Sequence, residues 1–426
     1  MHGGFLSFRD PGKFWRGFLF AVVMGFFVPP VVGSVVSVHR ETNGWELRVD
    51  GTPYFVKGVC YQPTRVGEDP AQGSQRDWMT VDDDHDGRID TPYQTWVDVN
   101  RNNVQDPSDV SVGDFQLLRD MGCNTLRIYH HAPSSAIFPP LPHGENPSAQ
   151  SGNLVSNKPL LRDLFATYGI RVAMGDLLGA YTVGSGAEWG KGTDYRDRMQ
   201  RKRMLKSVEK MVLDHKDEPY LLMWVLGNEN NFPEKTHTNA KSFPGVYARF
   251  VNEAAELIHR LDPHHPVCVV YGDVLDFLPF VPPEPAYDLV GINSYRTPDF
   301  GNLWADVAQV FDRPLLLTEM GAGPAPVEEG VLDETAQSVI HANAWQDIYS
   351  HSRDQRSPAN ALGGFVFEWT DNWWYNGSPH QQGVDSSPSP WNEEYMGLAS
   401  QGDGKNSPWL RQLRPVYFMY QKLWRN

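Results

Sequence analysis

The stretch Leu221-Leu-Met-Trp-Val-Leu-Gly-Asn-Glu229 places a glutamate just after a run of apolar residues. A run of this length is typical of a buried strand. The stretch Pro314-Leu-Leu-Leu-Thr-Glu319-Met-Gly321 repeats the arrangement 90 residues further on. A carboxylate at the end of a buried strand is costly unless it is paired or used. Glu229 and Glu319 are therefore the first candidates for functional residues.

Apolar runs of this kind recur along the chain and alternate with helical patterns. The predicted strands span residues 54–61, 124–130, 171–178, 221–226, 267–271, 289–294, 314–318 and 363–368. Predicted helices, with apolar residues at i, i+3 and i+4, span residues 115–121, 246–261, 303–311 and 334–351. This spacing is typical of helices that pack on a sheet. Before the first barrel strand, Asp50-Gly51 between two alternating runs predicts a β-hairpin.

Eight short apolar strands alternating with helices predict an α/β fold, a single-domain (β/α)8 TIM barrel over residues 35–426. A doubly wound open sheet is the alternative, and it is disfavoured because no glycine-rich phosphate-binding turn follows the first strand. Functional residues of such barrels gather at the carboxyl ends of the strands. Both glutamates lie at such ends.

Composition and charge narrow the possible partners. The 426-residue chain has 40% hydrophobic residues and a formal net charge of −15. This charge disfavours nucleic acid and anionic membrane surfaces, because both are bound by clustered Lys and Arg. The three cysteines, Cys60, Cys123 and Cys268, show no metal-binding spacing. Buried free thiols are the preferred interpretation, and one disulfide between Cys60 and Cys123 is the alternative.

The N-terminus has the pattern of an export signal. Arg9, Lys13 and Arg16 precede an apolar stretch over residues 17–28, which Pro29-Pro30 ends. Small residues follow, so residues 1–34 are predicted to be a signal peptide. A retained membrane anchor is the alternative, although the apolar run is short for a complete span. We therefore expect a periplasmic or secreted protein.

With these elements placed, the chain resembles the clan A glycoside hydrolases, which are retaining enzymes on (β/α)8 barrels. Asn228-Glu229 after predicted strand four and Glu319 after strand seven match the clan's acid/base and nucleophile. Two further stretches resemble family 2, with some likeness to the family 72 glucanosyltransferases in the first: Val49-Asp-Gly-Thr-Pro-Tyr-Phe-Val-Lys-Gly-Val59 and Leu413-Arg-Pro-Val-Tyr-Phe-Met-Tyr420. The resemblance covers roughly residues 45 to 426.

The resemblance implies roles for particular residues. Glu229 would be the acid/base, Glu319 the nucleophile, and Asn228 would hold the sugar 2-hydroxyl. Further substrate-binding residues implied by the clan are Arg127, Tyr295 and Trp369. Of these, Arg127 would hydrogen-bond the nucleophile, Tyr295 would lie beside it, and Trp369 would form the floor of the first sugar site.

Cleavage of a glycosidic bond needs one protonated and one ionised carboxyl group, so the two must differ in environment. We expect Arg127 to lower the pKa of Glu319. An apolar wall and the charge of Glu319 should raise the pKa of Glu229. The expected substrate is a β-glucan or its oligosaccharides, and no cofactor is needed for catalysis. A transglycosylase using the same glutamates and a non-catalytic carbohydrate-binding protein are the alternatives.

Aromatic residues cluster after predicted strand eight in Glu368-Trp-Thr-Asp-Asn-Trp-Trp-Tyr375, and Trp391 follows. Sugar rings pack their C–H faces on aromatic planes, so Trp373 and Trp374 are candidate sugar platforms, with packing inside the loop as the alternative. Asp371 could bind a hydroxyl or cap a turn. His130, after strand two, could contact sugar or satisfy loop backbone.

An acidic insertion over residues 79–112 suggests a metal site. Asp82-Asp-Asp-His-Asp-Gly-Arg-Ile-Asp90 places oxygen ligands at positions 1, 3, 5 and 9 of an EF-hand-like loop: Asp82, Asp84, Asp86 and Asp90. Gly87 stands at position 6, and Tyr93 replaces the glutamate of position 12.

The pattern repeats 16 residues later with another set of oxygen ligands: Asp98, Asn100, Asn102, Asp106 and Asp109. Here Asn103 replaces the glycine, and asparagine tolerates a left-handed backbone. The sequence therefore predicts one or two structural Ca²⁺ ions, with a solvated acidic loop as the alternative.

Overall fold

The computed structural model describes residues 33–131, 157–328, 331–375, 377–383 and 392–425. The predicted signal peptide lies almost entirely outside this range. Eight strands close into a barrel, each pairing in parallel with its neighbours. They are β4 (Val56–Cys60), β7 (Thr125–Ile128), β8 (Arg171–Asp176), β9 (Leu221–Leu226), β10 (Val267–Gly272), β11 (Leu289–Asn293), β12 (Leu315–Met320) and β15 (Ala361–Val366).

The closure of the sheet confirms the predicted (β/α)8 barrel and excludes the open sheet. The last strand, β15, pairs with the first, β4, through a register that matches Gly363 with Val56. Each predicted strand overlaps one barrel strand, and the predicted bounds of β9 agree with the structure. Strand β9 is buried along its whole length, as expected for a strand packed on both faces.

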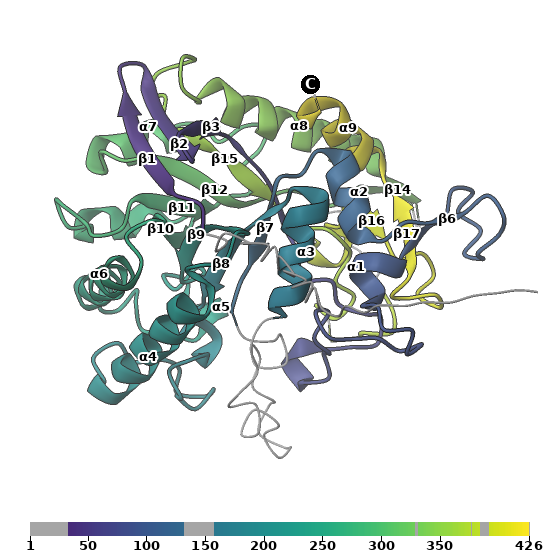
Figure 1. Cartoon of the computed structure of the whole chain (residues 1–426), viewed down its shortest axis with the longest axis horizontal. Helices are drawn as coiled ribbons and strands as arrows, with labels where there is room; N and C mark the ends of the chain where they lie inside the picture. The colour runs from purple at the N-terminus through teal and green to yellow at the C-terminus, as the bar shows by residue number, and fades with distance from the viewer. Residues whose placement is uncertain (1–32, 132–156, 329–330, 376, 384–391, 426) are drawn as a thin grey trace, which may run out of the picture. The chain divides into compact units, whose positions relative to one another are not determined.

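Helices cover the outside of the barrel (Figure 1). The longer ones are α2 (Asp114–Met121), α3 (Lys158–Tyr168), α4 (Arg198–His215), α6 (Pro244–Leu261), α7 (Leu303–Val310), α8 (Glu334–Ser350) and α9 (Pro415–Trp424). Local sequence explains several of their ends. The Asp197 carboxylate caps α4 by accepting from the N–H groups of Met199 and Gln200. Gly122 and Gly169 end α2 and α3 in the left-handed conformation.

A small antiparallel sheet precedes the barrel. Its strands are β1 (Val36–Glu41), β2 (Gly44–Val49) and β3 (Thr52–Tyr54). The β2–β3 turn is the predicted hairpin, because Val49 pairs with Thr52 and the two turn residues, Asp50 and Gly51, both have positive φ. Such backbone angles match the twist of the flanking strands.

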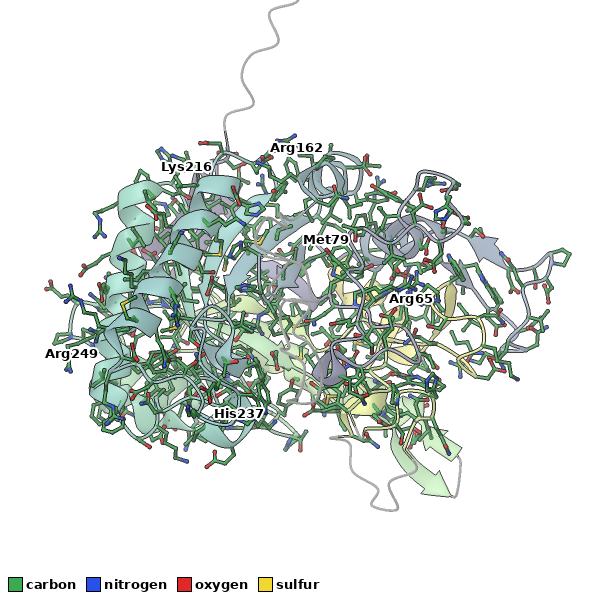
Figure 2. All side chains as sticks on the ribbon, turned by 90° about the horizontal axis from the view of Figure 1, so that it is seen from below. Arg65, Met79, Arg162, Lys216, His237 and Arg249 are labelled. Carbon is green, nitrogen blue, oxygen red and sulfur yellow. The ribbon has the colours of Figure 1, made fainter. Side chains whose placement is uncertain are left out.

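The acidic insertion lies between β4 and α2, in a long segment where Figure 2 labels Arg65 and Met79. Its short elements are η1 (Pro70–Gln72), α1 (Asp90–Gln94), β5 (Trp96–Val97) and β6 (Val110–Ser111). Strands β5 and β6 join β16 (Ala399–Ser400) and β17 (Leu410–Leu413) in a four-stranded sheet. The insertion is thus tied to the C-terminal part of the chain.

The remaining short elements lie in loops: η4 (Ala180–Thr182), α5 (Pro233–Thr236), η5 (Leu275–Phe280), β13 (Ala325–Glu328), β14 (Val331–Asp333) and η6 (Glu393–Tyr395). Cys60, Cys123 and Cys268 are buried free thiols, so the free-thiol prediction is confirmed and the disulfide alternative is wrong. Over the part of the chain that the structure describes, no helix has the length and apolar character required to cross a membrane.

Candidate active site

Glu319 lies near the carboxyl end of β12, where three side chains donate hydrogen bonds to its carboxylate. Arg127 Nη1 and the Tyr129 hydroxyl reach Oε1 at 2.9 and 2.7 Å, and the Tyr295 hydroxyl reaches Oε2 at 2.8 Å. Arg127 is 1% exposed. A buried guanidinium and two hydroxyl donors fix the orientation of the carboxylate.

Glu229 follows β9 through a tight turn. Gly227 has a φ of +77° and Glu229 a φ of +54°, a left-handed conformation that is uncommon for a residue with a side chain. The Asn230 side chain supports the turn by accepting the Asn228 N–H at 2.8 Å. Backbone strain of this kind persists only where surrounding contacts enforce it, and it is often found at functional sites.

Asn228 connects the two glutamates. Its Oδ1 accepts hydrogen bonds from Arg127 Nη2 at 2.8 Å and from Asn293 Nδ2 at 3.0 Å. Both donors fix which way the amide points, and Nδ2 then lies 3.4 Å from the Tyr181 hydroxyl in the cleft. The same arginine therefore positions Glu319 and the residue before Glu229.

The electrostatic environment of Glu229 differs from that of an exposed glutamate. Burial, followed by the negative charge of Glu319, raises the pKa of Glu229 to about 7, although the nearby Lys235 acts in the opposite direction. These are the causes expected from the sequence. A carboxyl group with this pKa retains a proton near neutral pH, as a general acid requires.

Both glutamates open into one cleft of about 450 Å³. Both aromatic side chains and polar groups line it, as in many ligand sites. The residues lining it are Gln62, Thr64, Tyr129, Leu177, Tyr181, Trp189, Asn228, Glu229, Lys235, Tyr295, Glu319, Phe367, Glu368, Asn372, Trp374, Tyr375 and Glu393.

Two tryptophans expected in the cleft lie elsewhere. Trp369 is 1% exposed and packs near Tyr417, with ring centroids 6.3 Å apart. Phe367 lines the cleft instead and meets Tyr295 edge-on at 6.2 Å. The physical reason is position, because Phe367 is the first residue after β15 and Trp369 belongs to the loop beyond. Trp373 is buried and does not line the cleft, so packing inside the loop is its role. Trp391 lies outside the described residues.

His130 is buried behind the cleft rather than in its lining. Its Nδ1 accepts the Leu177 N–H at 3.4 Å and lies 3.9 Å from Asp176 Oδ2. Burial lowers the pKa of His130 to about 4, so the ring is neutral at physiological pH. Of the two interpretations, satisfaction of loop backbone fits the structure and direct sugar contact does not.

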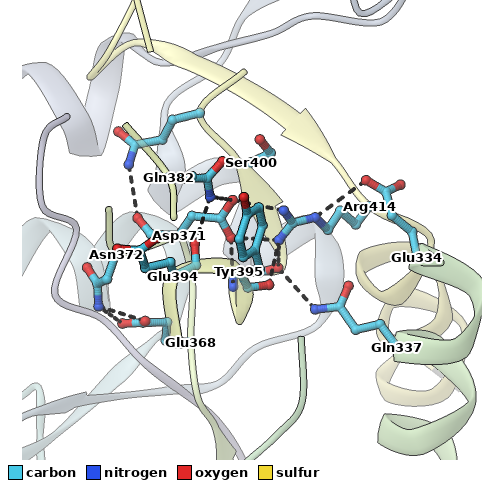
Figure 3. Close-up of polar contacts among 12 residues, drawn as sticks. Glu334, Gln337, Glu368, Asp371, Asn372, Gln382, Glu394, Tyr395, Ser400 and Arg414 are labelled. Carbon is cyan, nitrogen blue, oxygen red and sulfur yellow. Dashed lines mark hydrogen bonds and ion pairs between the residues drawn. The ribbon is translucent and has the colours of Figure 1, made fainter. Parts of the chain in front are cut away.

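The loop after β15 is anchored by a buried ion pair (Figure 3). Arg414 binds Asp371 with two hydrogen bonds of 2.7 and 2.8 Å. Next to this pair, Asn372 Nδ2 donates to both oxygens of Glu368, which lines the cleft. Asp371 is therefore neither a sugar ligand nor a turn cap. It holds the segment that carries the aromatic side of the cleft.

The acidic insertion forms two loops, residues 82–93 and 98–109, which we call the acidic loops. Their backbones match at positions 4 and 6, where the non-glycine residues His85, Arg101 and Asn103 and the glycine Gly87 have positive φ. Their hydrogen bonds match as well, because the N–H of position 6 donates to the carboxylate of position 1 in each loop, at 3.0 and 2.9 Å. The repeated sequence thus gives a repeated structure.

The first acidic loop fits a cation. Oxygens of Asp82, Asp84 and Asp86 lie within 4.8 Å of one another. Oδ1 of Asp82 is buried and has no hydrogen-bond partner among the described residues. Asp90 is not part of this group, because its carboxylate pairs with Arg65 at 2.7 Å.

The second acidic loop is less convergent. Within the described residues, its acidic side chains do not form a group of three, and both oxygens of Asp109 accept backbone N–H groups. Asn100 and Asn102 turn their amide nitrogens toward Asp106. Their amide oxygens accept the backbone N–H groups of Asn102 and Val104 at 3.0 and 2.8 Å.

Several cleft residues were missed by the sequence analysis: Tyr129, Tyr181, Trp189, Lys235, Phe367, Glu368 and Glu393. For Tyr129 a signal existed. It lies two residues after Arg127, and alternate residues of a strand share one face. The others come from loops far apart in the sequence, and no local pattern brings them together.

Comparison with known proteins supports the fold. No protein-family model matches the chain, and no curated protein matches its sequence. A solved GH2 β-galacturonidase from Eisenbergiella tayi is similar with a TM-score of 0.52 and 14% identity, over 92% of this chain and 54% of that chain. A solved β-D-glucuronidase from Dictyoglomus thermophilum is similar with a TM-score of 0.52 and 15% identity, over 92% of this chain and 54% of that chain.

A Bacteroides uniformis β-glucuronidase gives a TM-score of 0.54 and 15% identity, over 91% of this chain and 37% of that chain. This chain therefore spans about half or less of the length of these proteins. Because the sequence identities are low, the structural similarity establishes likeness of fold alone. The described chain has a (β/α)8 barrel like that of the family 2 glycoside hydrolases, as the resemblance of its strand-end residues implied.

Proposed function

We propose that the chain is an exported, retaining β-glycoside hydrolase that acts on a β-glucan or its oligosaccharides. One observation carries the proposal. Two carboxyl groups at barrel strand ends face one cleft, and Glu319 has three hydrogen-bond donors while burial raises the pKa of Glu229 to about 7. Double displacement requires one carboxyl group that can donate a proton and a second that can attack the sugar.

The first step would form a glycosyl-enzyme. An oxygen of Glu319 attacks the anomeric carbon, the glycosidic bond breaks, and Glu229 gives its proton to the leaving oxygen. Arg127, Tyr129 and Tyr295 hold the attacking carboxylate in place. In the second step Glu229, now ionised, takes a proton from water as the water oxygen attacks the same carbon. Glu319 leaves as a carboxylate, and both groups return to their starting states.

The substrate part of the proposal rests on the cleft lining. Trp189, Phe367, Trp374 and Tyr375 offer aromatic surfaces on which sugar rings can pack. If a sugar hydroxyl replaces water in the second step, the same residues perform transglycosylation. A non-catalytic carbohydrate-binding protein would use the same surfaces, but its sugar binding would not require Glu319 as a nucleophile.

The test uses protein from residue 35 onward with a panel of β-linked gluco-, manno- and galacto-oligosaccharides, and products are sized by mass spectrometry. We expect shorter products from the gluco-oligosaccharides, and none from the Glu319→Gln variant. Longer products would identify a transglycosylase. Products that persist in Glu319→Gln would contradict the roles assigned here, and binding without any product would identify a carbohydrate-binding protein.

We also propose that the acidic loops bind Ca²⁺ as a structural ion. The converging oxygens of Asp82, Asp84 and Asp86 support this, as does the unpartnered Oδ1 of Asp82. Hard oxygen ligands of this kind suit Ca²⁺. The ion would neutralise mutual repulsion among the carboxylates and hold the insertion, while the carboxyl pair carries out the chemistry.

A further inference from the structure

The cleft contains more carboxyl groups than the proposed reaction uses. Glu229 and Glu319 have roles in it, but Glu368 and Glu393 also line the cleft. The only cationic side chain among its lining residues in the described chain is Lys235. Burial, followed by the negative charges of Glu393, Asp371 and Glu319, holds the pKa of Glu368 well above its usual range. The lining of the cleft thus places four carboxyl groups beside a single ammonium group among the described residues.

Each cation around Glu229 already has a carboxylate partner. Lys235 Nζ lies 3.7 Å from Glu393. Arg127 binds Glu319 from behind the cleft. A second depression of about 430 Å³ shares Glu229 and Lys235 with the cleft, and it adds Arg296.

Arg296 is also neutralised, because it binds Asp273 with two hydrogen bonds of 2.7 and 2.6 Å. The cations that line both depressions thus already have carboxylate partners, although the Lys235 side chain is 64% exposed. Within the described residues that line them, an anionic ligand would have to compete with a carboxylate for each cation.

This arrangement distinguishes two classes of sugar. The hydroxyl groups of a neutral sugar can donate to the oxygens of these carboxyl groups, whether the groups are ionised or protonated. A uronic acid carries an additional carboxylate, which needs a cation or several N–H donors to offset its desolvation. Like charges brought together in a binding site oppose association.

We propose that this cleft selects uncharged glycosides against uronides, and that Glu393 contributes to this choice by neutralising Lys235. The inference deepens the proposed function and rests on it for the reaction, though not for the preference in binding. It also separates this chain from the solved barrels of similar fold whose names give uronides as substrates. Proteins with similar barrels would then differ in whether they prefer charged or uncharged sugars.

The test compares matched 4-nitrophenyl pairs, β-glucoside with β-glucuronide and β-galactoside with β-galacturonide. We expect the wild-type kcat/KM to favour the uncharged member of at least one pair by more than about tenfold, given the cost of like-charge contacts. Glu393→Gln should move that ratio toward the uronide by about tenfold, because one negative charge is removed and Lys235 is released. Adding Lys235→Met to Glu393→Gln should reverse the part of the change that comes from the lysine.

The matched control is Asp312→Asn, which removes a carboxylate from an exposed ion pair with Arg40 just before β12, at the opposite end of the barrel. It should leave the ratio as in wild type. A wild-type preference for the uronide would overturn the inference, and so would a Glu393→Gln ratio equal to that of the control.

Non-hydrolysable 1-thio-glycosides separate this inference from the proposed activity, because calorimetry measures their binding without turnover. Binding of the uncharged thioglycosides together with no turnover of any O-glycoside would contradict the hydrolase and support the charge preference. Turnover that depends on Glu319 but favours uronides would support the hydrolase and contradict the charge preference. If no uncharged thioglycoside binds, the inference also fails.

Discussion

The chain concentrates carboxylates in two regions, the cleft and the acidic loops, and it stabilises them differently. In the cleft the partners are side chains from distant strands. Arg127 and Glu319 are 192 positions apart in the sequence. In the acidic loops many partners are nearby backbone groups, and side chains such as Arg65 and Gln412 add to them. The Gly87 N–H donates to Asp82 across only five positions.

The cleft depends on tertiary contacts, whereas the backbone of the acidic loops depends on local sequence. In the cleft Glu229 and Glu368 are buried, so their protonation depends on the tertiary structure around them. In the acidic loops Asp84 and Asp86 are exposed and Asp90 and Asp98 are buried. The backbone of these loops follows from a short sequence that repeats. Changes in the cleft should therefore act on chemistry, and changes in the loops on stability. The predictions below test this comparison, beginning with the largest effect.

Replacing the proposed nucleophile should have the largest effect. Glu319→Gln retains size and hydrogen-bonding capacity but cannot form the glycosyl-enzyme, so kcat should fall by at least about a thousandfold. Steady-state kinetics on the best oligosaccharide would measure this, with Asp312→Asn as the control. A loss of less than tenfold would remove Glu319 from the reaction.

Replacing the proposed acid/base should depend on the leaving group. Glu229→Ala removes the proton donor, so natural oligosaccharides should lose about a hundredfold or more in rate of glycosyl-enzyme formation. A 2,4-dinitrophenyl glycoside, whose leaving group needs no proton, should lose much less in kcat/KM. Equal losses on both substrates would show that Glu229 acts in some other way.

The pH dependence follows from the pKa of Glu229, which burial and Glu319 raise to about 7. The acid must be protonated for the first step, so its active fraction decreases as pH rises through this value. We expect kcat/KM for a natural oligosaccharide to fall above pH 7, by about tenfold per pH unit at the limit. The Glu229→Gln variant should lack this decrease above pH 7. If the decrease is unchanged in that variant, another group causes it.

The smallest effect is expected at the acidic loops, and it should be on stability. Saturating Ca²⁺ should raise Tm by several degrees, because an ion that binds only the folded state stabilises it by about 2.7 kcal/mol at 100 times Kd. A chelator should reverse the shift in differential scanning calorimetry. The Asp82→Asn, Asp84→Asn double variant should abolish most of it. A Tm that is independent of Ca²⁺ would leave the loops as solvated acidic turns.

The predictions from sequence were best where local pattern and position in the fold coincide. Glu229 and Glu319 were expected at one rim because each ends an apolar run, and both line the cleft. Arg127, Asn228 and Tyr295 come together with them, as the resemblance implied. The aromatic residues were harder to place. The sequence analysis expected Trp369 in the cleft and missed Phe367, because only the point at which β15 ends places Phe367 in the lining.

The sequence by itself determined the barrel, the hairpin and the repeated backbone of the acidic loops. Each depends on periodicity or on short-range hydrogen bonds that a local segment carries with it. Only the tertiary structure decided which side chains meet at the cleft, which histidines and tryptophans are buried behind it, and that Lys235 lies beside Glu393. Those contacts join segments far apart in the chain, and their energies depend on burial, which no single segment sets alone.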